Sequence, residues 1–229
     1  MSLETLFHQI TSPDRPFYHY PTYWLLCWVS WVYALIQRAR AIGYERGLLR
    51  ARRLPVPVIS VGNLTLGGTG KTPTVMWLAE TLQKMGHRPA ILSRGYGGEA
   101  IEPVNVVSDG ETVLMDVKEA GDEPVLLANR LPGVPVLTGR RRHHPGLYAH
   151  QKFGVDVVIL DDGYQHLALK RDLNLLLVDH QSPLGNSRVF PAGPLREPVQ
   201  AAKRADAVLV TRCRESSDVS DIENLLGVD

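Results

Sequence analysis

Apolar and polar positions follow two patterns along this chain of 229 residues. After Pro55, short β-branched apolar runs alternate with longer stretches in which apolar residues recur at helical spacing. The apolar runs predict strands over residues 56–62, 88–93, 134–139, 155–163, 173–179 and 206–212. The stretches between them predict helices over residues 72–86, 123–131 and 140–153. Residues 101–117 are expected to form short strands with a turn at Asp109-Gly110.

Strand runs that are apolar throughout and separated by helices are typical of a parallel sheet with both faces covered. The predicted fold class is therefore α/β, with a mainly parallel sheet between helices. The domain organisation expected is an N-terminal helical segment over 1–54, a core over 55–215, and the start of a further region over 216–229. A capping-box pattern, Ser220 with Glu223, opens a helix where the sequence stops, so the sequence is expected to be either truncated or an unusually short relative of a longer protein.

The N-terminal segment has an unusual pattern, because residues 16–37 contain no Asp, Glu, Lys or Arg. Its apolar centre, residues 23–36, is shorter than the roughly 18–20 residues that span a bilayer, and no secretory signal pattern is present. Trp24, Trp28, Trp31 and Leu35 recur at helical spacing, and an arginine cluster follows them: Arg38, Arg40, Arg46, Arg50, Arg52 and Arg53. Two readings stay open: membrane contact through the aromatic residues and arginines, or packing of this stripe on the core.

Composition narrows the functional classes. The formal net charge is +1, so no strong positive field argues for binding to nucleic acid. Two cysteines, Cys27 and Cys213, lie far apart, which argues against a structural zinc site or a disulfide framework.

The segment GNLTLGGTGKTP, residues 62–73, joins a predicted strand to a predicted helix, which is the context of a phosphate-binding loop. Glycines let successive N–H groups face an anion, and the helix N-terminus adds positive charge. Lys71 is expected to reach the β- and γ-phosphates and Thr72 to hold Mg²⁺. Thr65 stands where the common loop pattern has its first glycine, so this is a variant of a P-loop NTPase-like core. The nucleotide-binding residues expected are Thr65, Leu66, Gly67, Gly68, Thr69, Gly70, Lys71 and Thr72; the alternative is a glycine-rich turn without a ligand.

Acidic residues follow two other predicted elements. Asp161 and Asp162 end a strongly apolar strand, where a carboxylate is expected to coordinate Mg²⁺; the alternative is a simple turn at Asp162-Gly163. Asp122 precedes a predicted helix, so it is either an N-cap or a carboxylate that accepts a proton from a substrate hydroxyl.

Two basic elements remain. Arg94 follows a strand end, where it either meets phosphate oxygens or lies free on the surface. The run GRRRHH, residues 139–144, opens a predicted helix, where the helix dipole disfavours cations. It is either an anion-binding element, for a substrate phosphate or lipid headgroup, or a solvated basic turn.

Five segments, VPVISVGNLTLGGTGKTP, SRGYGG, GDEP, LDDGYQH and PAGPLREP, occur here in the order typical of tetraacyldisaccharide 4'-kinases, the lipid A 4'-kinases of Gram-negative bacteria. The chain resembles that family over nearly its whole length, Thr65 included. The resemblance implies transfer of the ATP γ-phosphate to the 4'-hydroxyl of a tetraacylated disaccharide 1-phosphate, giving lipid IVA. It also implies work at the cytoplasmic face of the inner membrane, reached through the N-terminal helix.

By the same resemblance, ATP and Mg²⁺ are the cofactors, and the partners are the acylated disaccharide 1-phosphate and a membrane surface. Asp122 looks like the catalytic base, with Lys71 and Arg94 in the active site. Thr72, Asp161, Asp162 and Glu123 would lie near the metal. Relatives continue for roughly a hundred residues into a C-terminal domain that contains a histidine partner of the catalytic aspartate.

Two rival interpretations remain. One is an ATPase switch of the partitioning or division-site type, against which Leu66 argues, because those proteins place a lysine before the two glycines. The other is a fragment that only binds ATP or lipid.

Overall fold

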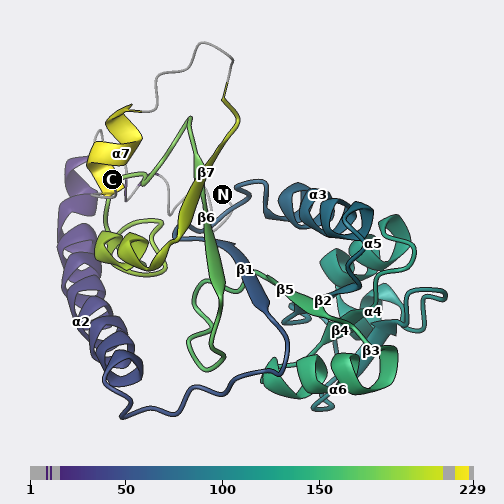
Figure 1. Cartoon of the computed structure of the whole chain (residues 1–229). Coiled ribbons are helices and arrows are strands. Elements are labelled where there is room, and N and C mark those ends of the chain that lie inside the picture. Colours follow the sequence, from purple (N-terminus) through teal and green to yellow (C-terminus); the bar gives the residue numbers. More distant parts are fainter. Residues whose placement is uncertain (1–8, 10, 12–15, 214–219, 227–229) are drawn as a thin grey trace.

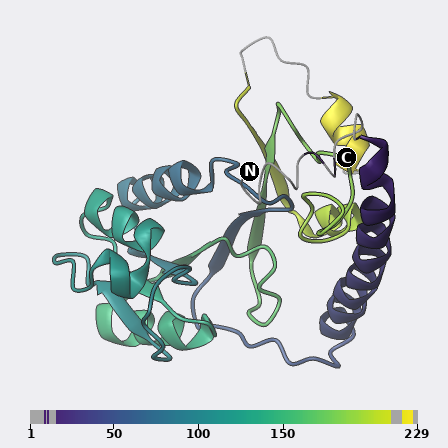
Figure 2. The ribbon, with the colours of Figure 1, turned by 180° about the vertical axis from the view of Figure 1, so that it is seen from behind.

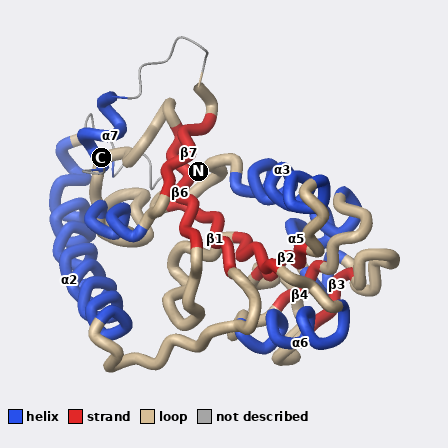
Figure 3. The backbone as a smooth tube through the Cα atoms, viewed as in Figure 1, coloured by secondary structure: helices blue, strands red, loops and turns tan. Residues whose placement is uncertain are grey.

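A single seven-stranded sheet organises the computed structural model, which describes residues 9, 11, 16–213 and 220–226 (Figure 1). The strands are β1 (Val58–Asn63), β2 (Pro89–Ser93), β3 (Asn105–Ser108), β4 (Val136–Thr138), β5 (Val157–Asp161), β6 (Leu173–Asp179) and β7 (Ala207–Thr211). Their order is β3-β4-β2-β5-β1-β6-β7, and every pairing is parallel except that of β3 with β4. Figure 3 shows the strands running through the centre of the molecule with helices around them.

Helices cover both faces of the sheet. On one face α3 (Lys71–Lys84) and α5 (Asp122–Arg130) pack on residues such as Val61, Ile91 and Ile159. On the other face α6 (His143–Phe153) packs on the alternate positions of the same strands, including Val58 and Leu160. The predicted α/β class with a mainly parallel, doubly covered sheet is therefore confirmed.

A third apolar cluster lies at the β6–β7 end of the sheet. It joins Leu176 and Val178 to η2 (Val199–Arg204) and α7 (Ser220–Leu226), and it includes Tyr33 from α2 (Tyr20–Glu45). A short helix, η1 (Phe17–His19), leads into α2. Figures 1 and 2 both show α2 as a long helix on the outside of this end. The helix expected from Ser220 forms, but the side chain of Glu223 lies outside the described residues, so the capping box stays a prediction.

The stripe of Trp24, Trp28, Trp31 and Leu35 faces away from the core, with Trp exposures of 65%, 65% and 62%. The opposite face of α2 is held by polar contacts: Ser30 Oγ donates to Val189 O (2.9 Å), and the Tyr33 hydroxyl donates to Arg196 O (3.0 Å). The reading in which the stripe packs on the core is therefore wrong. In the described part of the chain, no helix is both long and apolar enough to cross a bilayer.

Residues 101–117 depart from prediction. Only β3 is a strand, and the segment ends in a short helix, α4 (Val117–Ala120), whose N-terminus is a capping box of Asp116 and Glu119. The turn at Asp109-Gly110 is confirmed, since Asp109 Oδ1 accepts from the amides of Glu111 and Thr112 (2.9 and 2.8 Å). A local side-chain cap decided the helix, where apolar periodicity alone suggested a strand.

Candidate active site

The loop between β1 and α3 has the conformation that its glycines allow. Gly67 and Gly70 have φ angles of 104° and 80°, a region that side chains rarely adopt. Thr65 is not among the positive-φ residues; it forms an isolated bridge with Leu195, and its backbone oxygen accepts from Asn63 Nδ2 (2.9 Å). The loop entry therefore has ordinary backbone geometry, which explains why a threonine is tolerated where the common pattern has glycine.

Residues at the end of β7 hold the middle of this loop. Thr211 Oγ1 donates to Thr69 O (3.0 Å), and the Arg212 guanidinium donates to Gly68 O (2.7 Å) while it pairs with Asp179 Oδ2 (2.7 Å). These bonds engage the carbonyls of Gly68 and Thr69, and the Leu66 amide donates to Pro194 O (2.7 Å), so the loop backbone is held in place on its β7 side. Sequence patterns did not indicate this support, because β7 lies far from the loop along the chain.

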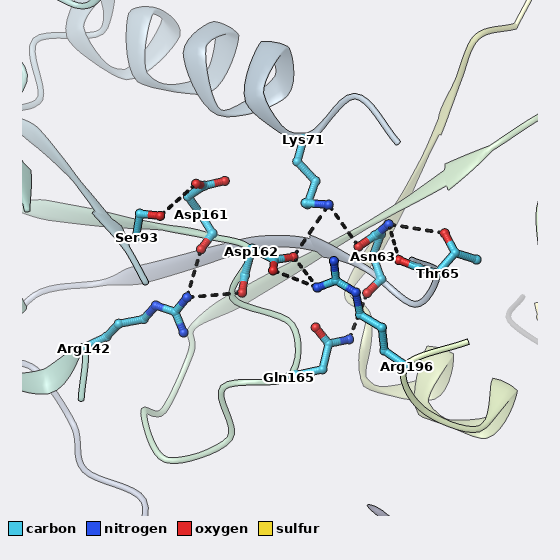
Figure 4. A network of polar contacts seen from close by, with 9 residues as sticks. All are labelled: Asn63, Thr65, Lys71, Ser93, Arg142, Asp161, Asp162, Gln165 and Arg196. Carbon is cyan, nitrogen blue, oxygen red and sulfur yellow. Dashed lines mark hydrogen bonds and ion pairs between the residues drawn. The ribbon is translucent and has the colours of Figure 1, made fainter. Parts of the chain in front are cut away.

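Lys71 and the strand-end acids lie together, as Figure 4 shows. Lys71 Nζ is 3.7 Å from Asp162 Oδ1 and 3.3 Å from Asn63 Oδ1. Arg196 binds Asp162 through both carboxylate oxygens (2.9 and 2.7 Å). Asp162 also has a positive φ of 48°, so its backbone turns sharply at the strand end. Asp162-Gly163 is therefore not simply a turn, because the Asp162 side chain contacts both Lys71 and Arg196.

The two adjacent acids differ in their electrostatics. Burial raises the pKa of Asp161 to about 6, and the negative charges of Glu123 and Asp162 add to this. Burial also acts to raise the pKa of Asp162, but the charges of Arg196 and Lys71 outweigh it, and the net pKa is lowered. Asp162 is thus a paired anion. Asp161 accepts one side-chain hydrogen bond, from Ser93 Oγ (3.2 Å), and has no ion pair in the described part of the chain.

Among the described residues, no three His, Cys, Asp or Glu side chains lie close enough together to hold a metal ion, so a divalent cation here would also need phosphate and water ligands. Asp161 is buried, and burial together with the negative charges of Glu123 and Asp162 raises its pKa, so a nearby cation would favour its ionised form. Mg²⁺ binds proteins through one or two carboxylates plus substrate phosphate oxygens and water. Thr72, in the first turn of α3 next to Lys71, can supply a hydroxyl.

Arg142 is the one arginine of the 139–144 run that turns inward. It is 4% exposed and donates to the carbonyls of Asp161 (3.3 Å) and Asp162 (3.4 Å). Helix α6 begins at His143, three residues later than predicted, which leaves the arginines in the preceding turn. A wholly solvated basic turn is therefore wrong for Arg142, whereas Arg140 and Arg141 are exposed.

Asp122 and Glu123 begin α5 and are exposed. The Asp122 carboxylate accepts from the Glu123 amide (2.9 Å), while the N-cap residue is Gly121. The SRGYGG turn packs on the segment just before them, because a Cβ at Gly98 would lie 2.7 Å from the Ala120 carbonyl carbon. The negative charge of Glu123 helps to raise the pKa of Asp161, so the start of α5 lies within electrostatic range of the strand-end acids. The catalytic role of Asp122 stays a prediction.

Beside Lys71 and Asp162 lies a cavity of about 600 Å³ with a strongly basic lining. It is lined by Tyr33, Gln37, Arg40, Arg94, Arg140, Arg142, Asp162, Gln165, His166 and Arg196. Burial, with nearby arginines, lowers the pKa of His166 to about 3, so this imidazole is neutral. Arg94 and Asp162 both line this cavity.

The sequence analysis gave no individual role to five residues that make polar contacts in the site: Asn63, Ser93, Arg142, Gln165 and Arg196. Asn63 and Ser93 end strands at the same edge as Asp161, and that position was the available signal.

The sheet order, the loop between β1 and α3, and the acids at the end of β5 define an α/β protein of the P-loop NTPase-like class. A family model described as tetraacyldisaccharide-1-P 4'-kinase (LpxK) matches residues 22–225. The chain belongs to this family.

Named relatives agree with the family model. The chain is 56% identical over 189 residues to a tetraacyldisaccharide 4'-kinase of Pelobacter propionicus and 55% identical over 182 residues to that of Geobacter sulfurreducens. These alignments cover 82% and 80% of this chain and 52% of each relative. A crystal structure of LpxK from Aquifex aeolicus in complex with ATP superposes with a TM-score of 0.75 at 44% identity, over 80% of this chain and 57% of that one. The chain spans about half the length of the curated relatives it matches.

Proposed function

We propose that the protein containing this chain transfers the γ-phosphate of ATP to the 4'-hydroxyl of a tetraacyldisaccharide 1-phosphate, forming lipid IVA. The observation that carries the proposal is a family-matched P-loop whose Lys71 lies 3.7 Å from Asp162 at the edge of an arginine-lined cavity. The cavity supplies cations for a phosphorylated sugar, and the P-loop lies beside it for the nucleotide. The ATP named for the Aquifex aeolicus relative supports ATP as the donor.

Phosphoryl transfer depends mainly on positioning the two substrates and neutralising the charge of the phosphates, and different residues of the chain serve each purpose. The loop over residues 65–72 binds the nucleotide phosphates, with Lys71 at the β- and γ-phosphates. Thr72 and Asp161 would hold Mg²⁺, with Glu123 nearby, and the bound ion would neutralise phosphate oxygens. Asp162, already paired with Arg196 and Lys71, positions these two cations.

At the acceptor, Asp122 takes the proton of the 4'-hydroxyl as it attacks, and Arg94 contacts phosphate oxygens. The exposure of Asp122 supports this role, because a base must reach a hydroxyl that enters from outside.

The test is label transfer from ATP to the acylated disaccharide by the full-length protein. Asp122→Asn should lower transfer by about 10²–10⁴-fold and leave the Kd for ATP unchanged. Asp116→Asn is the matched control, since asparagine caps helices as well as aspartate does, and it should keep full activity. ATP hydrolysis of equal rate with and without acceptor, and no labelled lipid, would instead favour an ATPase switch.

The exposed stripe on α2 is proposed to lie at the surface of the inner membrane on its cytoplasmic side, with residues 1–54 as the membrane-associating segment. Tryptophans favour the membrane–water interface, and the arginines after the stripe suit anionic headgroups. Trp28→Gln should weaken cosedimentation with anionic vesicles. Trp77→Gln on α3 is the control, because Trp77 is also largely exposed (58%) but lies on another helix. Equal losses in both variants would refute a specific role for the stripe.

A further inference from the structure

A second basic cavity lies at the N-terminal end of α6, and we call it the α6 cavity. Its volume is about 320 Å³, and it shares only His166 with the larger cavity. It is lined by Tyr44, Arg50, Arg52, Arg141, His143, His144, His166 and Ala168. The lining comes from three places in the sequence: the end of α2 with the segment after it, the start of α6, and the turn after β5. Figure 1 shows the segment between α2 and β1 passing toward α6.

The lining of the α6 cavity gathers positive charge without a matching acid. It contains three arginines and no Asp or Glu. Among the residues that the structure describes, neither Arg50 nor Arg141 belongs to an ion pair, whereas the neighbouring Arg53 pairs with Asp172 (2.7 Å). Arg52 Nη1 instead lies 3.2 Å from the His144 ring nitrogen Nε2. Grouped cations of this kind repel one another, and a bound anion removes that cost.

Two further features of the lining favour an anion. The positive end of the α6 dipole points toward its first turn, where His143 and His144 stand and no acid is present. The Nδ1 atom of His143 is buried and has no hydrogen-bond partner among the described residues. Burial and the charge of Arg52 lower the pKa of His143, so its ring is neutral, and as the Nδ1–H tautomer the ring can donate to an anion.

We propose that the α6 cavity binds a phosphate group other than those of the nucleotide. Arg50 and Arg141 supply charge-assisted hydrogen bonds to its oxygens, and Arg52 with the two histidines closes the site. Phosphate fits better than a carboxylate because several donors converge from different segments and phosphate offers more oxygens. The phosphate is either free or carried by a lipid. The proposal does not depend on phosphoryl transfer by this protein.

The test follows the ring signals of His143 and His144 by NMR in the full-length protein during titration with inorganic phosphate, at ionic strength held constant with sodium chloride. Saturable shifts are expected. Arg50→Gln and Arg141→Gln should each weaken phosphate binding by about tenfold or more, since each removes a charged hydrogen-bond donor. Arg130→Gln, an exposed arginine at the end of α5, is the control and should bind phosphate as the wild type does. No saturable shift, or equal affinity in all variants, would overturn the proposal.

A second arm separates the two sources of phosphate. Flotation with phosphatidylcholine vesicles is compared with and without phosphatidic acid, whose headgroup is a phosphate monoester. If the site takes a lipid phosphate, phosphatidic acid increases binding and Arg141→Gln removes the increase. If the NMR shifts occur but the increase does not depend on Arg141, the ligand is free phosphate. A failed transfer assay with intact phosphate shifts would reject the proposed function and leave this inference standing.

Discussion

Replacing Asp161 by asparagine is expected to stabilise the protein when neither nucleotide nor divalent cation is bound. Asp161 is buried (2% exposed) beside Glu123 and Asp162, and its pKa is raised from 3.8 to about 6. The ionised form is therefore costly in the folded state. Asparagine has nearly the same shape and can still accept from Ser93, but it carries no charge.

The magnitude follows from linkage between protonation and folding. Each pH unit of difference in pKa corresponds to about 1.4 kcal/mol, so a pKa near 6 instead of 3.8 amounts to about 3 kcal/mol. Because the folded-state pKa is the higher one, this stability is fully present below about pH 3.8 and is lost as the pH rises through about 6. The gain from Asp161→Asn should thus be only about 0.5 kcal/mol at pH 4 and about 3 kcal/mol above pH 7.

The assay is thermal unfolding in the presence of a chelator, from pH 4 to pH 8. A gain of about 3 kcal/mol corresponds to a Tm higher by roughly 6–12 °C at pH 7.5. Glu111→Gln, which changes an exposed carboxyl in a turn, should shift stability by less than about 0.5 kcal/mol at any pH. Mg²⁺ with ATP is expected to stabilise the wild type, and Asp161→Asn should remove that stabilisation. The reasoning is refuted if Asp161→Asn unfolds at the wild-type temperature at pH 7.5, or if its gain is the same at pH 4.

Three further predictions concern the support of the site. Arg212→Gln should raise the Kd for ATP about tenfold, because the carbonyl of Gly68 loses a charged donor; calorimetry that finds an unchanged Kd would contradict the role of β7. Tyr164→Phe should lower the free energy of unfolding by about 1–2 kcal/mol, because its buried hydroxyl donates to Ala201 O (2.7 Å); urea denaturation measures this, and no loss would contradict it. The ring of His166 should stay neutral from pH 8 to about pH 4, since its pKa is about 3, and NMR detection of a titration near pH 6 would show this to be wrong.

Much of the fold could be predicted because the local signals agree with one another. The run over residues 173–179 is a strand at the predicted bounds, and the helices expected at 72–86 and 123–131 begin one residue earlier than predicted. Strands buried on both faces must be apolar throughout, so they are visible in the sequence. Residues 101–117 were less predictable, because the capping pair Asp116 and Glu119 competes with a weak apolar pattern.

Part of the candidate site could also be predicted from the sequence. The P-loop and the acid pair Asp161–Asp162 carry sequence patterns, because glycines at strained turns and acids at strand ends have local causes. Lys71 and Asp162 do come together, as a parallel sheet requires of elements that end at the same edge. The sequence predicted that Asp122 lies at the start of a helix, and it does. Its distance from a substrate hydroxyl depends on where the acceptor binds, which local sequence does not determine.

The sequence by itself determined the alternation of strands and helices, the phosphate loop and the aromatic stripe, since each follows from the periodicity or chemistry of neighbouring residues. Only the tertiary structure decided that the stripe of α2 faces outward, that Arg142 turns inward while Arg141 does not, and that Arg196 pairs with Asp162. The physical reason is that burial and charge pairing depend on segments far apart in the chain. Residue type limits which contacts are possible, but the packing of the whole sheet selects among them.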